Sequence, residues 1–298
     1  MSSRRPARTI ATMPTYLNED VTNDWDEVAP GWARWADVVE AQAAPLTAAL
    51  LAAAAVQPGD HLFELAAGPG ALAPTWSKLT GPTGRVLLTD GSPAMVDVAR
   101  SKSEGLANVD TATIDITAID QPDGSFDVVV CRMGLMFAPD PAAALAEIRR
   151  VLQPGGRFAA LTWAGAEHNP WLTCVGAAAA RAGLVPAGSA ADIGVIFSLG
   201  DPEELAALVT GAGFVDVDVR TVETTMHVER VDDYVDQICA LAPPLASALR
   251  GVPEDALDAL RRAAAELMAP HAGAAGIDLP GLALAVSGRA ATPNDRLR

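Results

Sequence analysis

The sequence predicts an α/β fold built on a seven-stranded, mostly parallel, doubly wound sheet. Two observations support this prediction. Strand-like and helix-like patterns alternate between about residues 57 and 163, and parallel strands need helical crossovers of this kind. Most strands in this stretch are also short apolar runs, which is typical of strands buried on both faces.

Each element is predicted from its local pattern. Seven segments have strand character: His61–Leu65, Arg85–Thr89, Val109–Thr113, Phe126–Cys131, Arg157–Trp163, Phe214–Val222 and Leu282–Val286. Helices are expected between the first five strands, at about 70–80, 93–103 and 141–152. Outside the strands, residues 24–56 and 231–272 have helical spacing, interrupted by Pro45 and by Pro243-Pro244. Asp201-Pro202-Glu203-Glu204 predicts a further helix start, with an N-cap acid and a proline at the first helical position.

These patterns divide the chain into five predicted parts. They are a flexible N-terminal arm (1–20), an N-terminal helical lid (21–56), an α/β core (57–230), a helical insertion that would cap the substrate (231–272), and the last core strand with a tail (273–298).

Composition excludes several classes of function. The 298-residue chain is 50% hydrophobic and has a formal net charge of −16, which argues against a nucleic-acid partner because phosphate contacts need clustered Lys and Arg. We expect no membrane partner either, since no segment is apolar for long enough to span a bilayer. Cys131, Cys174 and Cys239 are odd in number and widely spaced, so they predict neither a disulfide framework nor a metal site. A reduced, cytoplasmic compartment is expected.

One loop predicts an adenosine-containing cofactor. The apolar strand that ends at Glu64-Leu65 runs into the small residues Ala66-Ala67-Gly68-Pro69-Gly70, which let the backbone approach a ligand closely. Asp90 follows twenty residues after Gly70, at the end of the next strand, where an acid suits the two hydroxyls of a ribose.

The order and spacing of the motifs resemble the class I S-adenosylmethionine-dependent methyltransferases, in their small-molecule, ubiquinone- and menaquinone-biosynthesis-like branch. The segment Glu64–Gly70 resembles the family's acid-x-Gly-x-Gly-x-Gly loop, with Ala66 in place of the first glycine. Thr89–Met95 resembles its Asp-x-Ser-Pro-x-Met segment. Further resemblance lies in Asp115-Ile116, in Phe126–Val129 and in Arg149–Gly156, which match the segments around the third, fourth and fifth strands.

The resemblance implies S-adenosyl-L-methionine as the cofactor and assigns roles to residues. Glu64 would face the ammonium group, and Asp90 would accept hydrogen bonds from the ribose hydroxyls. Asp115 would accept from the adenine amino group, while Ile116 and Met95 would pack on the ring. The other cofactor-binding residues that it implies are Trp32 from the lid, Ala66, Gly68, Gly70, Gly91, Ser92, and Cys131 and Arg132, the last two mostly through their backbone.

The expected reaction is in-line transfer of a methyl group to O, N or C of a small, hydrophobic or aromatic metabolite. His168, after the fifth strand, is the candidate general base if the acceptor must lose a proton. Ala66 should cost little at negative φ and should be strained at positive φ. Two alternatives stay open: a protein that binds the cofactor but directs a cyclisation or rearrangement, and an NAD-dependent oxidoreductase. No metal is expected, and whether the protein forms a homodimer is left open.

Overall fold

The structure, a computed structural model, describes residues 20–186 and 194–297. The predicted flexible arm over residues 1–20 lies outside the described residues apart from Asp20. Among the described residues, no helix is both long enough and apolar enough to cross a membrane.

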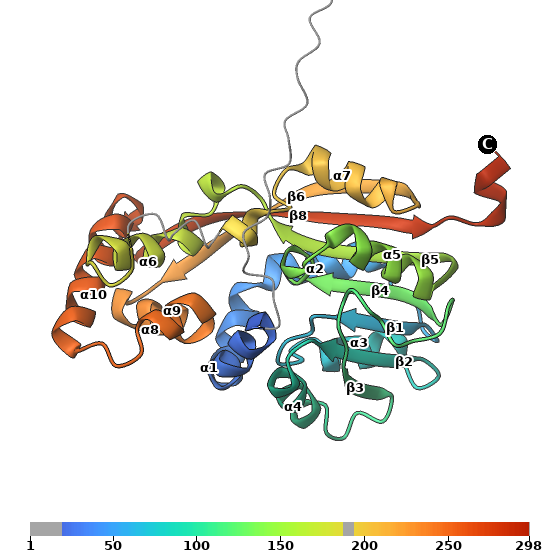
Figure 1. Ribbon diagram of the computed structural model, residues 1–298, viewed down its shortest axis with the longest axis horizontal. Helices are drawn as coiled ribbons and strands as arrows, with labels where there is room; N and C mark the ends of the chain where they lie inside the picture. Colours follow the sequence, from blue (N-terminus) through green and yellow to red (C-terminus); the bar gives the residue numbers. More distant parts are fainter. Residues whose placement is uncertain (1–19, 187–193, 298) are drawn as a thin grey trace, which may run out of the picture.

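One sheet forms the centre of the molecule (Figure 1). Its main strands are β1 (His61–Leu65), β2 (Arg85–Asp90), β3 (Val109–Thr113), β4 (Phe126–Arg132), β5 (Leu152–Trp163), β6 (Phe214–Val228) and β8 (Gly276–Ala290). They lie in the order β3-β2-β1-β4-β5-β8-β6. The first five are mutually parallel, and β8 runs antiparallel to both β5 and β6. The predicted fold class is therefore confirmed, with the addition of β7 (Ala272–Gly273), a two-residue strand that pairs with β8.

Helices flank the sheet, and a further group of helices lies at one end of the molecule (Figure 1). They are α1 (Asp20–Gln42), α2 (Ala44–Ala54), α3 (Ala73–Thr80), α4 (Pro93–Lys102), α5 (Pro141–Val151), α6 (Pro170–Arg181), α7 (Pro202–Gly211), α8 (Val231–Leu241), α9 (Pro243–Ala248) and α10 (Glu254–Met268). Short 3-10 turns lie at η1 (Leu135–Phe137), η2 (Ala166–His168), η4 (Ala269–His271) and η5 (Pro293–Leu297).

Alternation along the strands builds two apolar layers, because successive strand residues point to opposite faces of a sheet. Leu62 and Val128 pack in the layer that contains α2 and α3. Phe63 and Val129 pack in the layer that contains α5 and α7. The central strands β1 and β4 are therefore covered on both faces, as their apolar sequences predict, whereas β3 at the edge of the sheet has no buried residue.

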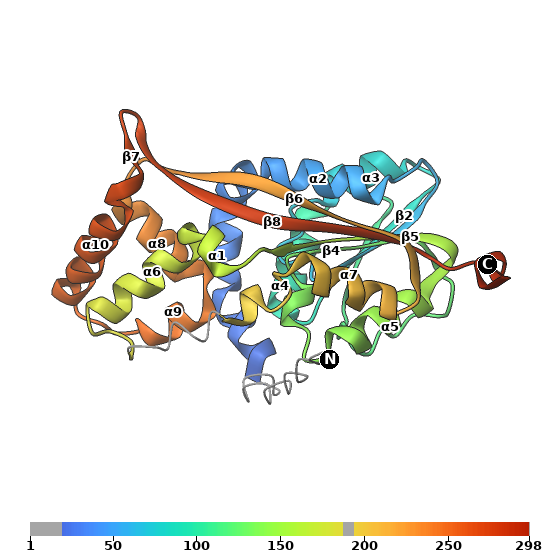
Figure 2. The same ribbon diagram turned by 90° about the horizontal axis from the view of Figure 1, so that it is seen from above.

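Strands β6 and β8 are longer than their local patterns predict. Their pairing continues beyond the expected Phe214–Val222 and Leu282–Val286 as far as Val228 opposite Ile277. Both strands reach out of the core toward α6, α8, α9 and α10, which gather at the far end (Figure 2). The extra length results from the pairing of two strands distant in sequence, which no local pattern reveals.

The sheet order changes direction at β1, since β2 and β4 lie on its two sides. In open parallel sheets, ligands bind outside the carboxyl ends of the strands at such a point. Most of the predicted cofactor-binding residues lie at or just after the ends of β1, β2 and β4, whereas Asp115 and Ile116 follow β3 and Trp32 lies on α1.

Candidate active site

Glu64 is a buried carboxylate near the end of β1, with 2% of its surface exposed. The indole N–H of Trp76, on α3, donates to Glu64 Oε2 over 2.8 Å. Burial raises the pKa of Glu64 from 4.5 to about 7, although the Arg132 guanidinium and the Trp76 hydrogen bond both act to lower it. A buried carboxyl group whose pKa lies this close to neutral pH is suited to bind a cation.

Asp90, at the end of β2, joins two loops of the site. Its Oδ2 accepts from Gly68 N and its Oδ1 accepts from Ser92 N, each over 2.9 Å. Burial raises the pKa of Asp90 above its ordinary range, and the backbone donors pull it back down. Asp90 therefore fixes the loop after β1 against the loop after β2.

The two glycines of the loop after β1 differ in their reasons for being glycine. Both have positive φ, 54° at Gly68 and 71° at Gly70. A Cβ at Gly68 would face open space, which leaves room for a ligand beside the backbone. A Cβ at Gly70 would lie 2.8 Å from Ala99 Cβ, so this glycine lets α4 pack against the loop.

Ala66 has a positive φ, the strained alternative of the two that the sequence allowed. Its φ is 51°, a region in which a Cβ is disfavoured. Its methyl group lies against Gly134, in the loop after β4, where a second Cβ would overlap it. The loops after β1 and β4 thus touch through one alanine and one glycine.

Cys131 and Arg132 end β4 and point to opposite faces of the sheet. Cys131 is fully buried in the layer with α5, and burial raises the pKa of its thiol to about 12. Arg132 Nη1 donates to Glu40 Oε2 over 2.7 Å and to Thr47 Oγ1 over 2.9 Å. The Arg132 side chain therefore reaches α1 and α2, in addition to the predicted backbone contribution.

Ser92 is the N-cap of α4 and contacts α1. Its Oγ accepts from Met95 N over 3.1 Å and donates to Asp26, on α1. Met95 is buried against Val28 of α1, whereas Gly91 is exposed and a Cβ there would meet open space. The start of α4 is thus covered by α1.

Asp115 and Ile116 lie in the loop between β3 and β4. Asp115 is exposed, and its Oδ1 accepts from Thr117 N and Thr117 Oγ1, each over 2.7 Å. Ile116 is partly buried against the layer that contains α5.

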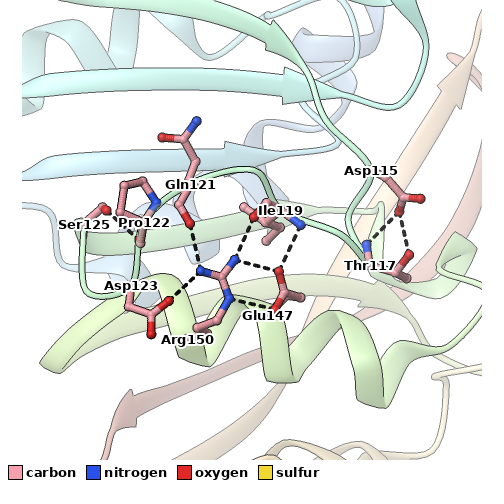
Figure 3. A network of polar contacts seen from close by, with 9 residues as sticks. All are labelled: Asp115, Thr117, Ile119, Gln121, Pro122, Asp123, Ser125, Glu147 and Arg150. Atoms are coloured by element: carbon pink, nitrogen blue, oxygen red, sulfur yellow. Dashed lines mark hydrogen bonds and ion pairs between the residues drawn. The ribbon is translucent and has the colours of Figure 1, made fainter.

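Arg150, on α5, braces this same loop (Figure 3). Its guanidinium donates to the carbonyl oxygens of Ile119 and Gln121 over 2.7 and 2.8 Å. It also pairs with Asp123 and Glu147, and Glu147 accepts from Ile119 N over 3.0 Å. The guanidinium of Arg150 therefore holds the loop that carries Asp115 in one conformation.

Trp32 packs against the cluster of Val28, Ala29 and Met95, beside the start of α4, while His168 lies in a separate 3-10 turn after β5. The indole N–H of Trp32 donates to Leu241 O over 3.0 Å, which ties the lid to α8. His168 is exposed in η2, which packs on α6 and β8, and its Nε2 lies 3.5 Å from Glu167 Oε1.

Comparison with known proteins identifies the domain. Residues 63–160 match the family model described as a methyltransferase domain. The chain carries a class I methyltransferase domain that uses S-adenosylmethionine. The match covers β1 to β5, the part of the sheet that bears Glu64, Asp90 and Arg132.

Relatives of the methyltransferase domain agree with this. The chain is 36% identical over 122 residues to the ubiquinone/menaquinone biosynthesis C-methyltransferase UbiE of Pseudoalteromonas translucida, over 40% of this chain and 49% of that protein. The chain thus spans about half the length of this curated relative.

Two solved structures share the fold. A phosphoethanolamine N-methyltransferase of Haemonchus contortus, in complex with S-adenosylhomocysteine, superposes with a TM-score of 0.53, at 16% identity, over 83% of this chain and 52% of that one. The [4+2]-cyclase SpnF superposes with a TM-score of 0.50, at 20% identity, over 83% of this chain and 80% of that one.

The residues of the methyltransferase domain fit the cofactor. The buried carboxylate of Glu64 and the half-buried carboxylate of Asp90 suit its ammonium and ribose hydroxyls, and the open space at Gly68 leaves room for it. Over residues 20–186 and 194–297, no three His, Cys, Asp or Glu side chains gather closely enough to hold a metal ion.

Sequence reasoning missed three side chains that contact this site: Asp26, Glu40 and Trp76. Asp26 lies inside the segment Trp25-Asp26-x-x-Ala29-x-x-Trp32, which marks the lid, but nothing local shows that it bonds to Ser92. Glu40 and Trp76 carry no recognisable motif. Their roles depend on tertiary contacts alone.

Proposed function

We propose that the protein transfers a methyl group from S-adenosylmethionine to O, N or C of a small, hydrophobic or aromatic metabolite by in-line displacement. The observation that carries this proposal is a pair of carboxylates, the buried Glu64 and the half-buried Asp90, at the ends of adjacent strands beside the open space at Gly68. The cofactor, when bound, supplies a methyl group that is already activated on a sulfonium.

The residues of this chain would hold and orient the reactants. Glu64 would bind the ammonium group, Asp90 the ribose hydroxyls and Asp115 the adenine amino group, on a loop that Arg150 keeps in place. Alignment of the acceptor with the methyl group then supplies much of the rate enhancement. His168 stays the candidate base for an acceptor that must lose a proton.

An apolar wall near the lid supports a hydrophobic acceptor. Trp25, on α1, packs edge-on against Phe137 at a centroid distance of 5.2 Å, and Met133 is partly buried nearby in sequence, with a φ of 58°. Strained backbone of this kind gathers at functional sites. Trp163 and Trp171 pack on each other within the core.

A transfer assay tests the proposal. The protein is incubated with S-adenosylmethionine labelled in the methyl group and a metabolite extract. We expect a labelled product one methylene heavier than an extract component, together with S-adenosylhomocysteine. Cofactor binding without any transferred label contradicts methyl transfer and favours a non-methylating reaction of the kind that the name of the [4+2]-cyclase describes. A small-molecule partner, a cytoplasmic location and the open question of a homodimer stay predictions.

Cofactor binding should depend on pH through Glu64. Its pKa is raised to about 7 in the empty site, so the carboxyl holds its proton below this value, while an ammonium beside it favours the ionised form. Affinity for S-adenosylmethionine should therefore rise between about pH 5 and pH 7 and level off above it, with a proton released on binding. Calorimetry in buffers of different ionisation enthalpy measures that proton, and Glu64→Gln should abolish its release.

The raised pKa of Glu64 makes the stability of the empty protein fall with pH, whereas cofactor affinity should rise. Because the pKa of Glu64 is raised on folding, its contribution to stability is full below about pH 4.5 and is lost as the pH rises through about 7. Relative to Glu64→Gln, the free energy of unfolding of the empty protein should fall by about 3 kcal/mol over this interval. A stability difference independent of pH would contradict the shift.

A further inference from the structure

The lid helix α1 lies between the methyltransferase core and the helices of the insertion (Figures 1 and 2). On the insertion side, Trp32 bonds to Leu241 O, and Arg250 Nη2 lies 2.6 Å from Glu27 Oε2. Gly31 lies against the carbonyl of Ala240, so closely that a Cβ there would overlap it. This side of α1 is therefore fixed to α8 and to the end of α9.

On the core side, α1 presents two carboxylates. Asp26 Oδ1 accepts from Ser92 Oγ and from Ala94 N, the latter over 3.1 Å. Glu40 accepts from Arg132 over 2.7 Å and from Thr47 Oγ1 over 2.7 Å. The two acids are 14 positions apart, about four helical turns, so they lie on the same face of α1.

Each of these acids acts electrostatically on one of the two site carboxylates, Glu64 and Asp90. The negative charge of Asp26 raises the pKa of Asp90, and that of Glu40 raises the pKa of Glu64. Arg132 is the cation that faces both Glu40 and Glu64. Four carboxylates thus lie around this site, with the guanidinium of Arg132 beside Glu40 and Glu64, and a ligand with net positive charge relieves the repulsion within each pair.

S-adenosylmethionine and its product S-adenosylhomocysteine differ in this respect. The substrate form carries a sulfonium in addition to its amino-acid zwitterion, whereas the product carries a neutral thioether. We propose that Asp26 and Glu40 are specificity-determining residues of the cofactor site, whose charge favours the sulfonium form over the product. This inference rests on the proposed function, since it requires that the site bind this cofactor.

A purely structural role would affect the two ligands alike. If Asp26 and Glu40 only hold α1 in place, their replacement loosens the lid over either ligand. If their charge selects the sulfonium, their replacement lowers affinity for the charged ligand and spares the neutral one. The ratio of the two affinities is therefore the quantity that separates these roles.

The test uses substitutions that keep an oxygen acceptor and remove only the charge, Asp26→Asn and Glu40→Gln, singly and together. Dissociation constants are measured by calorimetry for S-adenosylmethionine, for S-adenosylhomocysteine, and for sinefungin, an analogue in which an amine-bearing carbon replaces the sulfonium. Asp37→Asn, an exposed acid on the same helix, makes the same change in net charge and is the matched control.

As a guide to scale, two unit charges ~10 Å apart, at an effective dielectric constant of about 20 to 80, interact strongly enough to change binding roughly two- to fifteenfold. We expect each substitution to weaken S-adenosylmethionine and sinefungin about threefold to tenfold at low salt and S-adenosylhomocysteine less than about twofold. The loss should shrink at high salt, and Asp37→Asn should change little.

Equal losses for all three ligands, or no loss for any, would overturn the inference. Failure of the unaltered protein to bind either adenosyl ligand would instead contradict the proposed function, so the two failures are distinguishable.

Discussion

Asp90→Ala should weaken S-adenosylmethionine binding by about 100-fold or more, the largest effect that we expect from a single substitution on binding. An ionised carboxylate facing two ribose hydroxyls makes two charge-assisted hydrogen bonds, each worth about 1.5–3 kcal/mol. Asp90 also orders the site in advance, because it accepts from Gly68 N and Ser92 N. Calorimetric titration with the cofactor measures the loss.

Two variants show whether that loss belongs to the site. Asp90→Asn keeps one oxygen acceptor and should fall between the unaltered protein and Asp90→Ala. Asp110→Ala removes an exposed acid of β3 and should leave the affinity unchanged. Thermal unfolding of each variant confirms that the protein is folded. Unchanged affinity in a folded Asp90→Ala protein would remove Asp90 from the cofactor site.

Gly134→Ala should be the most destabilising of the small substitutions near the site. The new methyl group would overlap Ala66 Cβ and lie 3.1 Å from Cys131 Sγ, in a buried position. Overpacking of this kind typically costs about 1–3 kcal/mol. Gly134 has a φ of −114°, which alanine readily adopts, so the expected loss comes from the contact and not from the backbone.

Ala66→Gly should rescue Gly134→Ala, because it removes the methyl group that the new one meets. Alone, Ala66→Gly should have a small net effect on the free energy of unfolding. It removes backbone strain of about 1 kcal/mol from the folded state. It also makes the unfolded chain more flexible, which costs about 0.4–1 kcal/mol. Denaturant unfolding of both single variants and the double variant gives the coupling energy, which we expect to be about 2 kcal/mol.

Ala67→Gly is the matched control for this rescue. It removes a methyl group from the neighbouring position of the same loop, which has an ordinary φ, and should not restore the stability of Gly134→Ala. Strict additivity of Ala66→Gly and Gly134→Ala would contradict the contact between the two loops.

The parts of this fold that sequence predicts are those determined by local pattern. Four of the five parallel strands are short, mostly apolar runs between turn residues, the exception being β3, and the predicted bounds match β1 to β4 closely. Glu64 and Asp90 could be selected because each lies at or next to the carboxyl end of a predicted strand. Parallel strands end at one edge, so acids in these positions meet.

Contacts across the chain could not be predicted in this way. Asp26 bonds to Ser92, 66 residues away, and Glu40 bonds to Arg132, 92 residues away. Neither pair has a motif, because an acid on an amphipathic helix normally faces solvent. The length of β6 and β8 likewise depends on their mutual pairing. For Ala66 the sequence defined the two outcomes, and only the backbone φ of 51° decides between them.

The most direct test of the central claim is a calorimetric comparison of the unaltered protein with three ligands: S-adenosylmethionine, S-adenosylhomocysteine and NAD. All three contain adenosine, so a site that recognises only this part would not separate them. The geometry of Glu64 and Asp90 predicts that both adenosyl ligands bind and that NAD does not. Binding of NAD, with no binding of either adenosyl ligand, would contradict the claim that this domain is a methyltransferase.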